Sequence, residues 1–205
     1  MDCIADIGEE TAAGGRSAVE ESSDIIEDTR RFFTVSLVAR IARHRRLSRD
    51  AVELAIGLAL PALCEALADL AARPLGAGIL ACAVARQYPA TPETIRNGIG
   101  SEAQDVAAAY GSGYMAYLVG EPAFARACTA IGHASGLDVQ EAKLLVGLVG
   151  WILASRLRLE QRRRQLSPAG LAALLAGTCS TTIKGVGGRR ARGTPRAEIE
   201  VRGHP

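Results

Sequence analysis

The residue types that most often carry chemistry are thinly spread along this chain of 205 residues. Its three histidines, His44, His133 and His204, are far apart and have no other ligand residue at the spacing of a metal site. Glu65 and Asp69 are four residues apart and would share one face of a helix, but no histidine motif or facing carboxylate accompanies them. We therefore expect no metal centre, no acid–base site and no cofactor, and a protein that is not an enzyme.

Motifs for nucleophiles and for phosphate loops are equally weak. Ser112 and Ser135 lie near glycines but lack the strand-to-helix turn of a nucleophile elbow. Gly111 and Gly113 follow a predicted helix rather than a strand, which argues against a phosphate-binding loop. The five cysteines include no C-x-x-C pair, which excludes a zinc or redox motif of that type. Three of them lie in runs rich in Ala and Leu, so we expect buried thiols in a reducing compartment at Cys64, Cys82 and Cys128.

Arginine is the residue type that does gather. Residues 1–28 hold nine acidic side chains against one arginine, whereas residues 29–46 hold six arginines and no acid. Two arginine clusters lie at predicted helix ends, and if those ends meet they form a positive patch able to bind phosphate groups bidentately. The alternative is that these arginines only keep the helix ends soluble. The candidate anion-binding residues are Arg40, Arg43, Arg45, Arg46, Arg49, Arg156, Arg158, Arg162, Arg163 and Arg164.

The composition favours a globular helical protein. Hydrophobic residues make up 48% of the chain and charged residues 22%, which excludes a fully disordered protein. Aromatic residues are only 4%, which argues against a β-sandwich or barrel. The acidic N-terminus has the wrong charge for a secretory or mitochondrial targeting segment. Because the longest uncharged apolar stretches, Leu54–Cys64 and Leu144–Ala154, fall short of the roughly 20 residues of a membrane span, we expect a cytoplasmic protein.

The apolar periodicity and the capping residues predict an all-α fold, a compact multi-helix bundle with disordered charged termini. We expect a disordered acidic tail over residues 1–23, a helical domain over 24–177 and a disordered basic tail over 178–205. Glycines at 111 and 113 predict an interruption between two short helices. The predicted helices cover residues 24–45, 48–72, 79–87, a short segment opened by Thr91-Pro92, 101–110, 114–119, 122–136, 138–164 and 168–177.

The two longest predicted helices resemble each other. Shifting the chain against itself by 90 residues aligns Gly57 with Gly147 and their leucine-rich surroundings. An internal repeat would make these two helices the centre of the bundle and would let them cross closely where the glycines remove side-chain bulk. The alternative is a chance match between leucine-rich helices of the same period.

Three segments carry a family resemblance: Leu60-Pro61-Ala62-Leu63, the run from Gly111 to Gly120, and Leu166-Ser167-Pro168-Ala169-Gly170-Leu171. In this order and spacing, over roughly residues 36–177, the chain resembles the YidB-like bacterial family, a domain of unknown function. The resemblance implies an all-helical, cytosolic bacterial protein without an assigned activity, and it carries no catalytic residue over. The chain departs from the family pattern at Val146-Gly147, where a Leu-Pro is usual, and at Gly111-Ser112, where a Gly-Asn is typical.

These observations predict a non-enzymatic helical interaction or scaffold module that binds a protein partner or associates with itself through apolar helix faces. The alternative is recognition of a phosphate surface, either an anionic membrane or nucleic acid, through the arginine clusters. A third hypothesis, an enzyme with an undetected site, requires a polar-lined pocket with at least two titratable side chains in contact. No small-molecule substrate is evident from the sequence.

Overall fold

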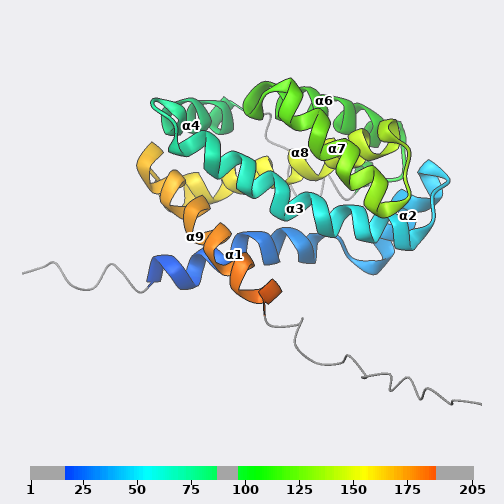
Figure 1. Ribbon diagram of the computed structural model, residues 1–205, viewed down its shortest axis with the longest axis horizontal. Helices are drawn as coiled ribbons and strands as arrows, with labels where there is room; N and C mark the ends of the chain where they lie inside the picture. The colour runs from blue at the N-terminus through cyan, green and yellow to red at the C-terminus, as the bar shows by residue number, and fades with distance from the viewer. Residues whose placement is uncertain (1–16, 87–96, 188–205) are drawn as a thin grey trace, which may run out of the picture.

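The computed structural model describes residues 17–86 and 97–187, and the side chains of residues 25–86 and 97–178. Over these residues the regular elements are eight α-helices, so the predicted all-α bundle is confirmed (Figure 1). The helices are α1 (Ser17–Phe32), α2 (Val35–Arg45), α3 (Arg49–Ala72), α4 (Gly76–Arg86), α6 (Glu102–Val119), α7 (Glu121–Ser135), α8 (Val139–Arg163) and α9 (Pro168–Gly187).

The two longest helices, α3 and α8, lie at the centre of the bundle. In Figure 1, α3 crosses in front of α8, with α6 and α7 above this pair and α1 and α9 below it. Both central helices contact each other and most of the remaining helices. Leu60, Leu67, Leu153 and Leu157 are almost completely buried between these layers. The bundle therefore has one continuous core, as expected of a single domain of this length.

Local capping residues fix several helix ends where the sequence predicts them. The Ser48 side chain accepts a hydrogen bond from the amide of Ala51, 3.1 Å away, at the start of α3. Asp138 caps α8 in the same way by accepting from the amides of Gln140 and Glu141. Gly136 ends α7 with a φ of 69°, a left-handed conformation that glycine adopts without strain.

The helix predicted over residues 24–45 is two helices, α1 and α2. The break lies at Phe33-Thr34, where Thr34 has an extended backbone and its hydroxyl accepts from the amide of Leu37. Phe32 is buried and Phe33 packs against it edge to face, with ring centroids 5.7 Å apart. A threonine cap and a buried phenylalanine pair thus redirect the chain within an otherwise helical pattern.

The interruption predicted at Gly111–Gly113 is wrong, because α6 runs unbroken through it. Gly111 lies directly against Gly147 of α8, where a Cβ atom on either glycine would collide with the other helix. The hydroxyl of Ser112 donates to the carbonyls of Ala108 and, across the crossing, of Lys143, at 2.8 and 3.0 Å. These small residues are present to bring α6 and α8 close together, rather than to turn the chain.

The predicted crossing of Gly57 with Gly147 is also wrong. A Cβ atom on Gly57 would meet no atom within 4 Å outside its own helix, so this glycine makes no close helix contact. Helices α3 and α8 do pack together, but the glycine that faces Gly147 is Gly111 of α6. The alignment at an offset of 90 residues identified two similar central helices and assigned the close contact to the wrong pair.

The described helices extend past both predicted domain limits. Helix α1 begins at Ser17 rather than at residue 24, and α9 continues to Gly187 rather than ending at 177. The rest of the predicted tails, and the short helix predicted after Thr91-Pro92, lie outside the described residues. Cys82, predicted to be buried, is exposed, whereas Cys64 and Cys128 are buried as expected.

Candidate functional site

The first arginine cluster is held largely by contacts within the protein. The guanidinium of Arg45, with 14% of the side chain exposed, donates from Nε and Nη2 to Glu141 at 2.8 and 2.9 Å, and from Nη1 to Asp105 at 2.6 Å. His44 Nε2 lies 3.1 Å from the other oxygen of Asp105. Arg40 donates to the carbonyl of Ile99. Arg45 therefore ties α2 to α6 and α8 and has little capacity left for an external anion.

The pKa values of this ionic cluster reflect its pairing. The hydrogen bond to Glu141 is the main cause that raises the pKa of Arg45, against the effect of burial. Burial alone would raise the pKa of Asp105, but hydrogen bonds from His44 and Arg45 outweigh it and lower that pKa. Three neighbouring arginines of the first cluster remain exposed: Arg43, Arg46 and Arg49.

The second cluster, near the end of α8, is likewise engaged. Arg156 lies over the ring of Phe32, with the guanidinium carbon 5.8 Å from the ring centroid. Arg163 and Arg164 both pair with Glu160, at 2.9 and 2.7 Å. Arg162 is exposed, and Arg158 is half-buried.

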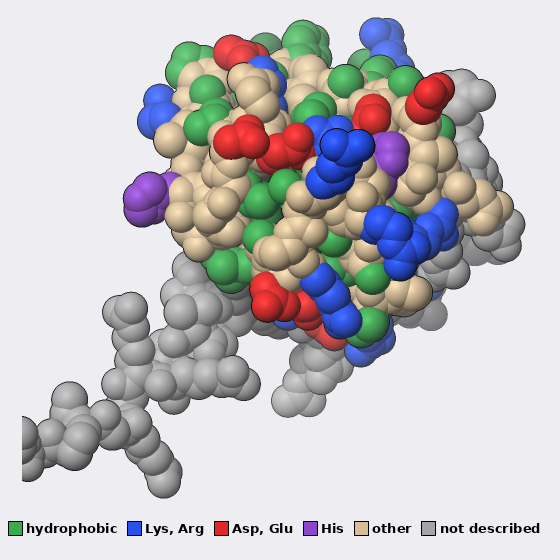
Figure 2. Space-filling view, turned by 90° about the vertical axis from the view of Figure 1, so that its right-hand side faces the viewer, with side chains coloured by type: hydrophobic (Ala, Val, Ile, Leu, Met, Phe, Trp, Pro, Cys, Tyr) green, Lys and Arg blue, Asp and Glu red, His purple; other side chains and the backbone are tan. Residues whose placement is uncertain are grey.

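The two clusters are tied to different points along α8. Arg45 of the first cluster contacts Glu141 in the first turn of α8, and Arg158 of the second lies 17 residues further along the same helix. At about 1.5 Å per residue this places Arg158 roughly 25 Å along α8 from the Arg45 contact. A single patch formed by both clusters stays a prediction. On the face drawn in Figure 2, acidic side chains also lie between the basic ones.

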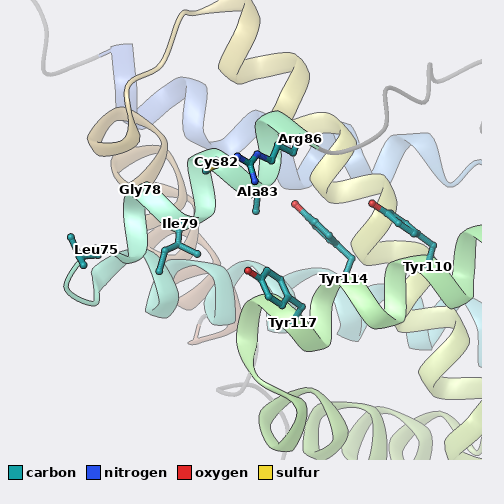
Figure 3. A pocket seen from close by; sticks show the side chains of 9 residues that line it. All are labelled: Leu75, Gly78, Ile79, Cys82, Ala83, Arg86, Tyr110, Tyr114 and Tyr117. Carbon is teal, nitrogen blue, oxygen red and sulfur yellow. The ribbon is translucent and has the colours of Figure 1, made fainter.

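A groove with a volume of about 580 Å³ lies between α4 and α6. Few direct contacts join these two helices, since α4 packs on α3, α8 and α9 while α6 packs on α7 and α8. Figure 3 shows the two walls of this groove. Its lining residues are Leu75, Gly78, Ile79, Cys82, Ala83 and Arg86 on the α4 side, and Tyr110, Tyr114 and Tyr117 on α6.

The α4 wall is an apolar stripe on the outer face of the helix. Ile79 and Cys82 are three residues apart on α4, and Leu75 directly precedes the helix. Leu75 and Ile79 are 85% and 49% exposed. The opposite face of α4 is buried through Leu80 and Val84. An apolar residue set on both faces of a helix is expected where the outer face also has a binding partner.

The α6 wall is built from three tyrosines spaced by four and three residues. Tyr110 and Tyr114 stack with their ring centroids 6.2 Å apart and an angle of 12° between the rings. Tyr117 is 77% exposed. The hydroxyl of Tyr114 is buried without a hydrogen-bond partner among the described residues, and this burial raises the pKa of Tyr114. The wall thus offers large aromatic surface and one unsatisfied polar group.

The groove is polar at one end and apolar at the other. Among the described residues that line it, Arg86 alone is charged, and no described carboxylate forms an ion pair with it. Figure 3 shows the Arg86 guanidinium turned back over Ala83, on the side to which the Tyr114 hydroxyl points, while Leu75 and Ile79 lie at the other end. In the part of the lining that the structure describes there is neither a histidine nor a carboxylate.

No groove was predicted here, although the amino-acid sequence contains one signal of it. Three of the four tyrosines of the chain fall within residues 110–117 at helical spacing. The interruption predicted at Gly111–Gly113 placed them on separate helices and hid the stripe. A second, smaller hollow of about 250 Å³ lies beside α3 and includes Gly57, Arg30 and Glu53.

Metal-binding groups and membrane-length helices are two further features of the described residues. Within the described residues, no group of three or more His, Cys, Asp or Glu side chains is placed to hold a metal ion. Helix α3 is long and apolar enough to cross a membrane by length and composition, a test that the buried core helix of a soluble protein also passes, and it packs against α4, α7, α8 and α9.

Comparison of the chain with protein-family models, with curated proteins and with solved structures finds no match. The resemblance to the YidB-like family therefore stays a prediction.

Proposed function

We propose that this protein is a helical interaction module whose α4–α6 groove binds an amphipathic helix of a partner protein. The observation that carries the proposal is the pair of exposed stripes that face each other across the groove, one aliphatic on α4 and one aromatic on α6. Each stripe uses the spacing by which helices present one face to a neighbouring helix.

The dimensions of the groove suit a helix. Residues 75–86 of the α4 wall extend for roughly 16 Å at about 1.5 Å per residue, which is the length of three helical turns. Leucine, isoleucine and tyrosine side chains that are half or more exposed supply the anchors that carry most of the energy in such interfaces. Complete burial of one of these aliphatic side chains is worth about 1.5–3 kcal/mol.

The charge of the groove favours a partner over a second copy of the chain. The one charge among its described lining residues is the positive Arg86, which a partner with an acidic residue would complement. Two copies joined groove to groove would instead bring two such arginines into one interface. Self-association through this face is thus an outcome of the test below rather than the proposal.

Site-specific photo-crosslinking in the source cells tests the proposal. The crosslinking residue replaces Ile79 in the groove, and in a matched control it replaces Leu54 on α3, because these two side chains are 49% and 48% exposed. We expect an adduct from position 79, but not from 54, whose crosslinked segment has apolar residues at helical spacing. Equal adducts at both positions, no adduct, or an adduct of twice the chain mass would contradict a partner helix in this groove.

Recognition of a phosphate surface by the arginines has less support, since Arg45 is paired with two carboxylates within the protein. A bacterial source, a cytoplasmic location and the lack of enzymatic activity stay predictions.

A further inference from the structure

We infer that the partner helix carries an acidic side chain, and that Arg86 and Tyr114 bind its carboxylate at one end of the α4–α6 groove. This inference rests on the proposed function and specifies which partner helices the groove accepts.

The guanidinium of Arg86 provides the charge. It lies in the last turn of α4, is exposed, and has no ion-pair partner among residues 25–86 and 97–178. The planar guanidinium matches a carboxylate by two parallel hydrogen bonds, which are stronger than neutral ones. None of the described lining residues is acidic, so nothing on these walls competes for Arg86.

The hydroxyl of Tyr114 provides an independent argument. It is buried, it forms no hydrogen bond within the described part of the chain, and it points towards the α4 wall near Ala83 and Arg86. A buried hydroxyl without a hydrogen-bond partner destabilises the fold, because it has given up its water and gained nothing in exchange. A carboxylate has two oxygens with about four acceptor positions, so one group accepts from Arg86 and, once the Tyr114 side chain turns its hydroxyl into the groove, from Tyr114 as well.

The polarity of the groove then sets the direction of the bound helix. Leu75 and Ile79 form the apolar end, and Arg86 lies 11 and 7 residues further along. A partner helix therefore places its apolar anchors over Leu75, Ile79 and Tyr117 and its acidic residue two to three turns away. Reversing the order of anchors and acid along the same helix axis would leave the carboxylate over aliphatic side chains, which disfavours that orientation.

Selection from a displayed library of helical peptides against the full-length chain tests this inference. The library fixes leucines at helical spacing and randomises the remaining positions. We expect selected peptides to be enriched about tenfold or more in Asp or Glu at one position, two to three turns from the leucine anchors. Selection against Arg86→Glu is expected to replace this acid by Lys or Arg. The matched control Arg126→Glu, an exposed arginine on α7, is expected to select the same acidic peptides as the natural chain.

The selected acidic peptide is then measured against Tyr114→Phe, which removes one oxygen and keeps the ring. We expect affinity to fall severalfold without a loss of protein stability, because the free protein leaves that hydroxyl unpaired. Three results would overturn this inference while groove binding stands. They are selected peptides without an acidic position, an acidic preference that persists against Arg86→Glu, and an affinity for the acidic peptide that Tyr114→Phe leaves unchanged. Failure to select any peptide, or peptides still bound by Ile79→Asp and Tyr117→Asp, would instead overturn the proposed function.

Discussion

Replacing Gly57 or Gly147 by alanine makes the same chemical change in the interior of two long helices, and the structure predicts opposite results. Alanine favours a helix over glycine by about 1 kcal/mol, which is the only consequence expected at Gly57, since its added Cβ meets no atom within 4 Å. Gly57→Ala should therefore stabilise the protein by about 0.5–1 kcal/mol.

At Gly147 the same methyl group collides with the carbonyl of Ala108 and with the amide and hydroxyl of Ser112. Backbone atoms cannot move aside as a flexible side chain can, so α6 and α8 have to separate. Overpacking of this kind costs about 1–3 kcal/mol, and loss of the hydrogen bond from Ser112 to the Lys143 carbonyl adds about 1 kcal/mol. After the gain in helix propensity, we expect Gly147→Ala to destabilise the protein by about 2 kcal/mol.

Urea unfolding and thermal unfolding of the full chain measure both changes. For a domain of this size each kcal/mol shifts Tm by about 2–4 °C, so Gly57→Ala should raise Tm by roughly 2 °C and Gly147→Ala should lower it by roughly 4–8 °C. Gly113→Ala is a control within α6, because a Cβ there also meets nothing within 4 Å, whereas Gly111→Ala collides with Gly147. Equal effects at Gly57 and Gly147 would refute the assignment of the close crossing to α6 and α8.

Three further predictions concern contacts that fix the helices. The pKa of Asp105 is lowered in the folded protein, so its ion pairs stabilise the fold above the unfolded pKa of about 3.9, and this stabilisation is lost as the pH falls through the lower folded pKa. Asp105→Asn should therefore flatten the acid side of a plot of urea midpoint against pH. An unchanged slope would contradict the pairing. Thr34→Ala should cost about 1 kcal/mol in chemical unfolding because it removes the cap of α2, while Ser36→Ala, which removes only the exposed hydrogen bond between the two hydroxyls and leaves the cap, should cost much less. Ser112→Ala should cost about 1 kcal/mol in the same measurement, since it removes the hydrogen bond from α6 to the Lys143 carbonyl of α8, and a neutral result would show that the hydroxyl does not join the two helices.

Features that depend on neighbours in sequence were predictable, and those that depend on distant residues were not. The caps at Ser48 and Asp138 and the left-handed end at Gly136 are local, so their residue types alone identified the helix ends. The ionic cluster of Arg45 joins residues 60 and 96 positions away, and nothing in the local pattern around Arg45 specifies Asp105 or Glu141 as its partners. The first arginine cluster, predicted as an anion-binding surface, is thus in part held by ion pairs within the protein.

The small residues of α6 fit two different local structures. Glycine and serine at 111 and 112 match a turn, and a local rule cannot distinguish a turn from a close helix contact that needs the same small residues. The distinction comes from Gly147, since only a second small residue on a facing helix makes close approach productive.

The same segment links the fold to the proposed site. The small residues of α6 lie against α8 and fix the rotation of α6 about its own axis. With about 100° between successive residues, Tyr110, Tyr114 and Tyr117 then lie on the side of α6 roughly opposite to that contact, which is where the groove opens towards α4. Bulky residues at the glycine positions would push α6 outward and turn the tyrosines away from Arg86. The glycines therefore serve the groove as well as the core, because the rigid contact behind α6 positions the aromatic face in front of it.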